Sequence, residues 1–241
     1  MSLPQALQRL KLPVIGAPMF IAGNPRLVVE QCKAGIVGSF PALNARPKEA
    51  LDGWLSEIEG ALAGHPEAAP YAVNQIVHKS NDRLEHDLEV CIRHKVPVTI
   101  TSLRAPNDAI LAAQAAGADL AYIGTRFLAT PEASVPERYK EEILKASAAD
   151  IVYTDLFSGV HGNYLKHSVI AAGLDPLDLP KSDPKKMNFG SGSGAEKKVW
   201  RDIWSAGQGV GQIDRVMPAA EVVEQLAREY LGAKRRLSLS S

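Results

Sequence analysis

Short apolar segments alternate with longer amphipathic ones along the first half of the chain. Each short segment is a run of apolar, often β-branched residues bounded by turn residues, which predicts a strand. These predicted strands lie at 13–19, 36–40, 71–77, 96–102 and 119–124. Apolar residues that recur at helical spacing predict helices at 25–34, 47–63, 81–94 and 108–116. This order is typical of a parallel sheet whose strands are joined by right-handed helical crossovers.

The first predicted helix has clear signals at both ends. Asn24 is a favourable N-cap residue, and Pro25 suits the first helical position because its missing N–H would have no partner there. Gly35 follows the last apolar turn and predicts a left-handed residue that ends the helix.

The second half of the chain loses this alternation. We predict helices at 134–147 and 218–235, and the Lys-, Gly- and Ser-rich segment 181–198 predicts an exposed loop. The sequence therefore divides into a (β/α) barrel portion, 1–130, and a helical and loop segment, 131–241, that packs on it. Five strands cannot close an eight-stranded barrel, so we expect an incomplete TIM-type (β/α) barrel of the α/β class with a C-terminal helical segment.

Composition narrows the choice of partner. Of 241 residues, 27 are Lys or Arg and 27 are Asp or Glu, so the formal net charge is zero. This balance gives no reason to expect a nucleic-acid or membrane-surface partner. The sequence shows no secretory signal pattern, and we expect a cytoplasmic protein. Cys32 and Cys91 lack metal-ligand spacing, so we expect buried thiols and no metal site.

In parallel α/β folds, ligands bind and functional side chains lie at the carboxyl ends of the strands. Apart from Arg126, the residues expected there are small or uncharged: Ala17, Pro18, Met19, Ser39, Phe40, Asn74, Gln75, Thr101, Ser102, Gly124 and Thr125. They include no pair of carboxylates and no nucleophile with a neighbouring base. Such a set suits a flat aromatic cofactor held by backbone and amide groups better than it suits proton transfer.

Three of these positions have two interpretations each. Gly124 and Thr125 fit either a phosphate-binding strand end or an ordinary strand-to-loop turn. Asn74 is a buried amide, which either binds the polar edge of a ring or is satisfied by neighbouring backbone. Among the histidines, His78 follows the third strand, and His161 either faces the site or is an ordinary surface or core residue.

Four stretches resemble the nitronate monooxygenases, formerly called 2-nitropropane dioxygenases. Their relatives include the flavin-dependent NADH:quinone reductases and enoyl-ACP reductases. The stretches are Ala17-Pro18-Met19, Asn74, GADLAYIGTRFLAT at 117–130 and WSAGQGVGQI at 204–213. The third stretch is the most specific, and the similarity extends over nearly the whole chain.

The resemblance implies a (β/α)8 barrel that binds FMN. It places Met19 and Asn74 against the isoalloxazine ring, together with Ala17 and Pro18 of the same loop. It also places Gly124 and Thr125 on the FMN phosphate, and Trp204 to Gln208, including Ser205, close to the flavin. The implied reaction is oxidation of an alkyl nitronate by O2, while some relatives use NAD(P)H. The implied partners are this small-molecule substrate and O2.

The chain departs from the family pattern near Asn107. Three βα units, on the order of 90 residues, would normally lie between Pro106 and Asp108. In the family that segment bears a Gly-Gly-His-type loop with the catalytic histidine and a Gly-rich loop that shares the phosphate. Neither loop occurs here, so the resemblance assigns no catalytic residue to this chain.

Three hypotheses remain open at this stage. The chain is an FMN-dependent oxidoreductase, a shortened family member that is inactive or assembles through its exposed strand edges, or a non-enzymatic α/β binding module. A quinone or enoyl reductase remains an alternative to the nitronate reaction. Flavin absorbance would favour the first hypothesis, and association in solution, including a homo-oligomer, would favour the second.

Overall fold

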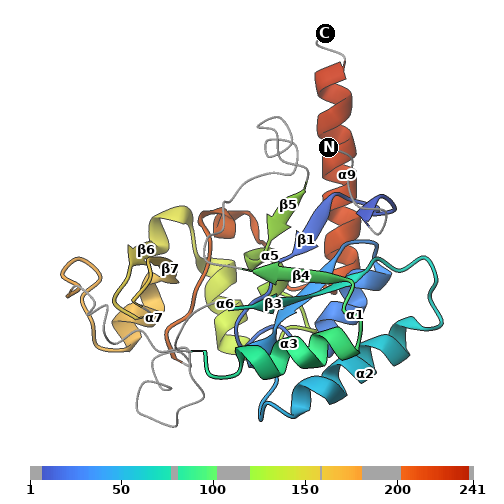
Figure 1. Ribbon diagram of the computed structural model, residues 1–241. Helices are drawn as coiled ribbons and strands as arrows, with labels where there is room; N and C mark the ends of the chain where they lie inside the picture. Colours follow the sequence, from blue (N-terminus) through green and yellow to red (C-terminus); the bar gives the residue numbers. More distant parts are fainter. Residues whose placement is uncertain (1–6, 77–80, 102–119, 158, 181–201, 239–241) are drawn as a thin grey trace.

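The computed structural model describes residues 7–76, 81–101, 120–157, 159–180 and 202–238 (Figure 1). In chain order the first elements are β1 (Val14–Gly16), α1 (Pro25–Lys33), β2 (Gly38–Pro41), α2 (Ala50–Leu62), β3 (Tyr71–Gln75), α3 (Leu84–Arg93) and β4 (Val98–Thr101). They are followed by β5 (Ala121–Ile123), α5 (Thr125–Leu128), α6 (Glu137–Lys145), β6 (Ile151–Thr154), β7 (Gly162–Leu165), α7 (Lys166–Ala171) and α9 (Ala219–Ser238). The predicted helix 108–116, the loop 181–198, the junction at Asn107 and His78 all lie outside the described residues.

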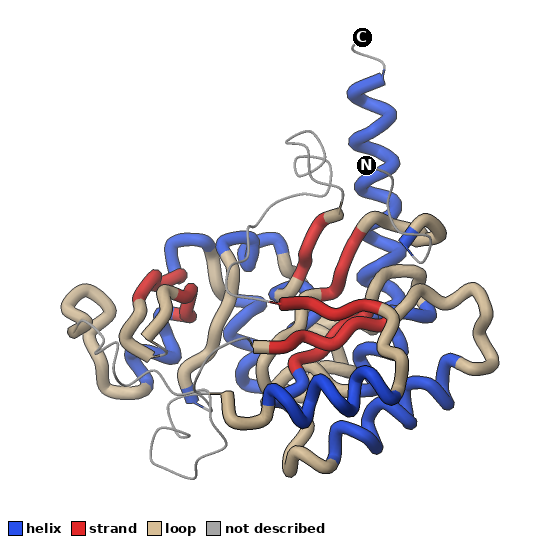
Figure 2. Tube along the Cα trace, viewed as in Figure 1, coloured by secondary structure: helices blue, strands red, loops and turns tan. Residues whose placement is uncertain are grey.

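Five parallel strands form the centre of the fold. β2, β3 and β4 pair in that order, β1 pairs with β5, and the bridge between Ile15 and Val37 links the two groups. The resulting order is β5-β1-β2-β3-β4, with α1, α2 and α3 covering one face (Figures 1 and 2). This confirms the α/β class and the five parallel strands, and the barrel is incomplete as predicted.

The first helix forms as its sequence predicts. The Asn24 side chain accepts a hydrogen bond from the Leu27 amide, and Pro25 occupies the start of the helix. Gly35 has φ of 94°, the left-handed conformation that glycine adopts without a Cβ clash. α1 consequently ends where the chain turns back into the sheet.

Two apolar clusters hold the strands against the helices. Val14 and Ala121 of the β1–β5 pair pack with Leu27 of α1 and with Val222 and Val223 of α9. A second cluster joins α1, α2 and α3 to β2 and β3, with Leu51, Leu55 and Ile58 of α2 fully buried. Complete burial of such side chains contributes roughly 1.5–3 kcal/mol each, so these clusters fix the positions of the strand ends.

The C-terminal part contains a β-hairpin that the sequence did not predict. β6 and β7 pair antiparallel, with Tyr153 opposite Asn163, and they stand with α7 on the side away from α2 (Figure 1). The expectation of helix and loop alone after residue 130 was therefore wrong. Each strand is only four residues long, so its local signal is weak. None of the described helices is both long and apolar enough to cross a membrane.

His94 joins α2 to α3 through two carboxylates. Its Nε2 lies 3.1 Å from Asp52 Oδ1, and its Nδ1 lies 3.1 Å from Glu59 Oε2. Burial opposes the charged imidazole, but hydrogen bonds to Glu59 and Asp52 outweigh it, so the His94 pKa is raised above its usual value. The protonated ring therefore stabilises the contact between the two helices.

The contacts of His94 with Asp52 and Glu59 predict that the stability of the fold depends on pH. Because the His94 pKa is raised in the folded state, its contribution is complete below the unfolded pKa of about 6.5 and disappears as the pH rises through the folded value. We expect His94→Gln to lower Tm by about 2–4 °C at pH 5.5 and by less at pH 9. Thermal unfolding across this range tests the prediction, with His65→Gln on an exposed loop as control. An equal loss at both pH values would contradict it.

Candidate functional site

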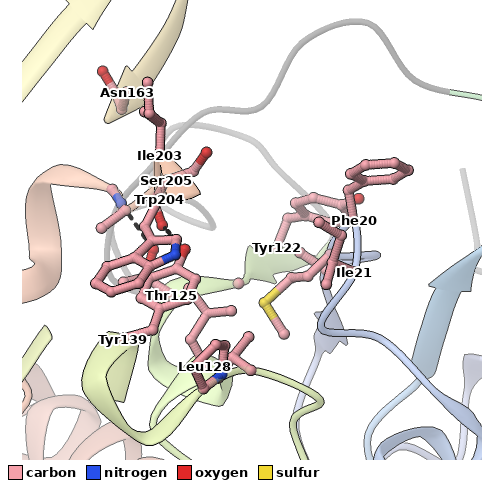
Figure 3. A pocket seen from close by; sticks show the side chains of 17 residues that line it. Phe20, Ile21, Tyr122, Thr125, Leu128, Tyr139, Asn163, Ile203, Trp204 and Ser205 are labelled. Atoms are coloured by element: carbon pink, nitrogen blue, oxygen red, sulfur yellow. Dashed lines mark hydrogen bonds between the residues drawn. The ribbon is translucent and has the colours of Figure 1, made fainter. Parts of the chain in front are cut away.

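A cavity of about 320 Å³ opens at the carboxyl ends of β1 and β5 (Figure 3). It lies at the lower end of the volumes typical of ligand pockets. The loop after β1 and the strand β5 form one side, and α6 and the segment 203–207 form the other. Its lining consists of Ala17, Met19, Phe20, Ile21, Tyr122, Gly124, Thr125, Leu128, Val135, Pro136, Tyr139, Asn163, Ile203, Trp204, Ser205, Ala206 and Gly207.

Parallel pairing of β1 with β5 creates the floor of this cavity. Gly16 lies opposite Ile123, and the Ala17 amide donates to the Ile123 carbonyl at 2.7 Å. The pairing therefore brings Ala17 beside Gly124, where a Cβ on residue 124 would lie 3.2 Å from the Ala17 Cβ. Small residues are needed on both strands for the two ends to approach this closely.

Hydrogen bonds donated by backbone amides hold the opposite wall of the cavity in place. The Leu165 amide donates to the Trp204 carbonyl at 2.7 Å, and the Trp204 amide donates to Ser168 Oγ at 3.0 Å. The Gly207 amide donates to Thr125 Oγ1 at 2.8 Å, which ties this segment to the start of α5, directly after β5. Residues 203–207 are therefore anchored to both β7 and α5.

A stacked pair of aromatic rings supports the same wall. The rings of Trp204 and Tyr139 stack with centroids 4.9 Å apart and planes 10° from parallel. The Tyr139 hydroxyl donates to the Ser205 carbonyl. In Figure 3, Trp204 and Tyr139 lie across the cavity from Phe20, Ile21 and Tyr122.

The cavity is electrically neutral. Among the described residues that line it there is no Asp, Glu, Lys, Arg or His. Its titratable side chains are Tyr122 and Tyr139, and burial raises the pKa of both phenols, so both stay protonated at neutral pH. Within the described ranges, no three His, Cys, Asp or Glu side chains gather as a metal-binding group. This lining can bind and orient an uncharged ring system, but its side chains offer no general base at neutral pH.

The structure brings together five of the residues predicted from sequence. Ala17, Met19, Gly124, Thr125 and Ser205 all line the cavity, as does Trp204 of the 204–208 stretch. Pro18 and Gln208 adjoin lining residues in the chain but are not part of the lining, and Gln208 is exposed.

Asn74 does not share this cavity with Met19 and Thr125, contrary to expectation. It lies on β3, two strands away from β1 in the sheet order, which corresponds to about 10 Å. Its side chain is only 4% exposed, and its Oδ1 has no hydrogen-bond partner among the described residues. Its role as a cofactor contact remains a prediction.

Arg126 and His161 lie outside the cavity lining. Arg126 Nη1 points to the Arg215 carbonyl at 3.5 Å, and burial lowers its pKa. His161 stacks on Tyr153, with ring centroids 4.9 Å apart, on the exposed side of the hairpin.

Sequence reasoning missed several lining residues. Tyr122 was detectable, because strand alternation places it on the face opposite Ala121 and Ile123, which pack in the core. Tyr139 and Asn163 reach the cavity through contacts between distant segments, which no local pattern reveals.

The hydrogen bond from the Gly207 amide to the Thr125 hydroxyl joins the two walls of the cavity, and its contribution to stability can be measured. Thr125→Val keeps the shape of the side chain but leaves the Gly207 amide without its acceptor, at a cost of about 1–2 kcal/mol. We expect a Tm reduction of a few degrees. Thr125→Ser retains the hydroxyl and should retain most of the stability. Equal destabilisation by both substitutions would show that the hydrogen bond is not the cause.

Comparison with known proteins supports the assignment that the resemblance suggested. The model of the nitronate monooxygenase family matches residues 94–229. The chain is similar to a nitronate monooxygenase of Paraburkholderia phytofirmans, with 32% identity over 139 residues, 56% of this chain and 38% of the relative. It is also 28% identical over 199 residues to the protein Rv1533 of Mycobacterium tuberculosis, covering 72% of this chain and 53% of that relative. The chain thus spans about half or less of the length of these relatives.

Solved structures show the same fold. FabK from Thermotoga maritima aligns with a TM-score of 0.71 and 18% identity, covering 98% of this chain and 97% of that one. A nitroalkane oxidase from Streptomyces ansochromogenes aligns with a TM-score of 0.76 and 18% identity, covering 96% of this chain and all of that one (100%). Both are TIM barrels, which agrees with the parallel strands described above. With its residues 94–229 matched by the family model, this chain belongs to the nitronate monooxygenase family.

Proposed function

We propose that this chain is a flavin-dependent oxidoreductase that binds FMN in the cavity at the ends of β1 and β5 and oxidises an alkyl nitronate with O2. The carrying observation is that this uncharged cavity is built by the stretches that resemble the family, including Ala17, Met19, Gly124 and Thr125. Family members are flavoenzymes, and FMN is the specific cofactor that we propose.

Two features of the structure fit a flavin. Gly124 leaves open the space beside Ala17 and Met19 that a side chain would fill, with the Met19 sulfur 3.8 Å from the position of a Cβ. The lining also carries the polar side chains of Thr125, Asn163 and Ser205 but no charged group, so it offers hydrogen-bond partners to the polar edge of a ring. Both features favour a planar ligand with a polar edge.

The residues of the chain have separable roles in this proposal. Met19 and Trp204 would contact the flavin from opposite sides, and Gly124 would allow close approach of the backbone. Thr125 Oγ1 already accepts from the Gly207 amide, so its own hydrogen is free to be donated to a phosphate oxygen. FMN would supply the electron-transfer chemistry when bound, while the uncharged lining would exclude water and orient the nitronate.

An assembly-dependent activity is the second candidate. β4 and β5 are the outer strands of the described sheet, and in the described residues neither pairs on its outer side. Thr99 of β4 is exposed, whereas a complete barrel would pair this strand on both sides. A chain that needs further strands would bind FMN only as a larger assembly, including a homo-oligomer, which size-exclusion chromatography with detection at 450 nm distinguishes from a flavin-binding monomer.

FMN binding should depend on the open space at Gly124. Gly124→Val would fill the floor between Ala17 and Met19, and we expect the Kd for FMN to rise at least tenfold. Gly53→Val is the matched control, because a Cβ there meets nothing within 4 Å. Titration of FMN fluorescence measures both. Equal affinities for the two variants, or no FMN binding by the parent protein, would contradict the proposal.

We expect the protein to catalyse the oxidation of alkyl nitronates by O2. With FMN bound, we expect O2 consumption that depends on added alkyl nitronate and does not require NAD(P)H. An oxygen electrode and NADPH absorbance at 340 nm, followed in parallel, separate this reaction from that of a reductase. Oxidation of NADPH driven by a quinone or an enoyl thioester, without nitronate turnover, would favour the reductase alternative.

A further inference from the structure

We infer that Asn44 is a positioning residue for the cavity. Its side-chain amide holds the loop 19–23, which forms one rim of the site, in a conformation that the sequence of the loop disfavours. The inference rests on the proposed function, because the shape of this rim matters for activity only if the cavity takes the cofactor and its substrate.

The loop contains an unusual backbone conformation. Ile21 has φ of 68°, in the left-handed region where the Cβ of a β-branched residue is crowded. Its side chain is 44% exposed and lines the cavity, so burial in a core does not offset this strain. Such conformations persist only where surrounding groups enforce them, and they are frequent at ligand-binding sites.

The enforcing group is the Asn44 amide. Its Oδ1 accepts from the Ile21 amide at 3.1 Å. Its Nδ2 donates to the Met19 carbonyl and to the Gly23 carbonyl, both at 2.9 Å. One side chain therefore satisfies three backbone groups spread across five residues, which only this compact loop conformation allows.

The loop has little room to adjust around these bonds. The Gly23 amide also donates to the Met19 carbonyl at 2.9 Å, and a Cβ on Gly23 would lie 3.1 Å from the same oxygen. The two ends of the loop are therefore in close contact, with Phe20 and Ile21 projecting at the turn between them. Figure 3 shows both side chains beside Tyr122, across the cavity from Trp204.

Asn44 is itself held from the helical layer. It ends the 3-10 helix η2 (Ala42–Asn44) that follows β2. Arg83 donates from Nη1 to the Ala45 carbonyl at 2.8 Å and from Nη2 to the Ala42 carbonyl at 3.3 Å. Arg83 is paired in turn with Asp87, which is fully buried, at 3.1 Å. The turn that carries Asn44 is thus fixed independently of the loop that it braces.

This arrangement assigns Asn44 to the rim of the site without placing it in the cavity. Asn44 is absent from the lining, so its effect on a ligand must pass through Met19, Phe20 and Ile21. A positioning role predicts that ligand affinity falls when the Asn44 amide is removed, although no lining residue is changed.

The experiment compares Asn44→Ala with the parent protein, because this substitution changes no residue of the cavity lining. With FMN as the probe, we expect the Kd to rise at least fivefold in Asn44→Ala, since Met19, Phe20 and Ile21 lose their fixed positions. Tyr71→Phe, which removes the hydrogen bond to Glu59 in the helical layer, controls for a general loss of stability and should leave the Kd unchanged.

A second readout separates this inference from the proposed function. Hydrogen–deuterium exchange of the peptide covering 19–23, measured without FMN, should accelerate at least tenfold in Asn44→Ala, because the Ile21 amide loses its acceptor. If the parent protein fails to bind FMN, the proposed function fails, and faster exchange still supports Asn44 as the brace of this loop. Unchanged exchange, or an Asn44→Ala variant that binds FMN as the parent does, overturns the inference.

Discussion

The parallel pairing of β1 with β5 is the constraint on which the rest of the structure depends. It joins the start of the sheet to a strand more than a hundred residues later, with Gly16 opposite Ile123. The apolar faces of both strands pack against α1 and α9, so burial in one core fixes the register. The cavity follows directly, because the residues immediately after the paired strands, Ala17 and Gly124, form its floor.

Charged groups are kept away from the cavity at the strand ends, and this separation suits the proposed role. The cavity is lined by apolar side chains, by the uncharged polar side chains of Thr125, Asn163 and Ser205, and by two protonated tyrosines. The buried ion pair of Arg83 with Asp87 and the cluster around His94 belong to α2 and α3. The charged groups thus brace the scaffold, while the uncharged cavity favours binding and orientation over proton transfer.

The parts of this molecule that depend on local chemistry were predictable from sequence. The strand segments, the Asn24 cap and the left-handed Gly35 each have a short-range signal, and the structure confirms them. The rule that strand ends meet at one edge correctly grouped Met19 with Thr125. The same rule wrongly placed Asn74 with them, because the cavity lies at the end of the β1–β5 pair and does not extend along the whole edge of the sheet. The β6–β7 hairpin and the Tyr139–Ser205 contact escaped prediction because they depend on packing between distant segments, which local patterns do not encode.

The central claim is that the hollow between the β1–β5 floor and the wall at Trp204 holds a flavin. Co-crystallisation of the full chain with FMN tests it most directly. The account predicts planar difference density between Met19 and Trp204, with the phosphate near Thr125. A flavin bound elsewhere on the chain, or a cavity that stays free of density at saturating FMN while the fold is intact, would contradict it.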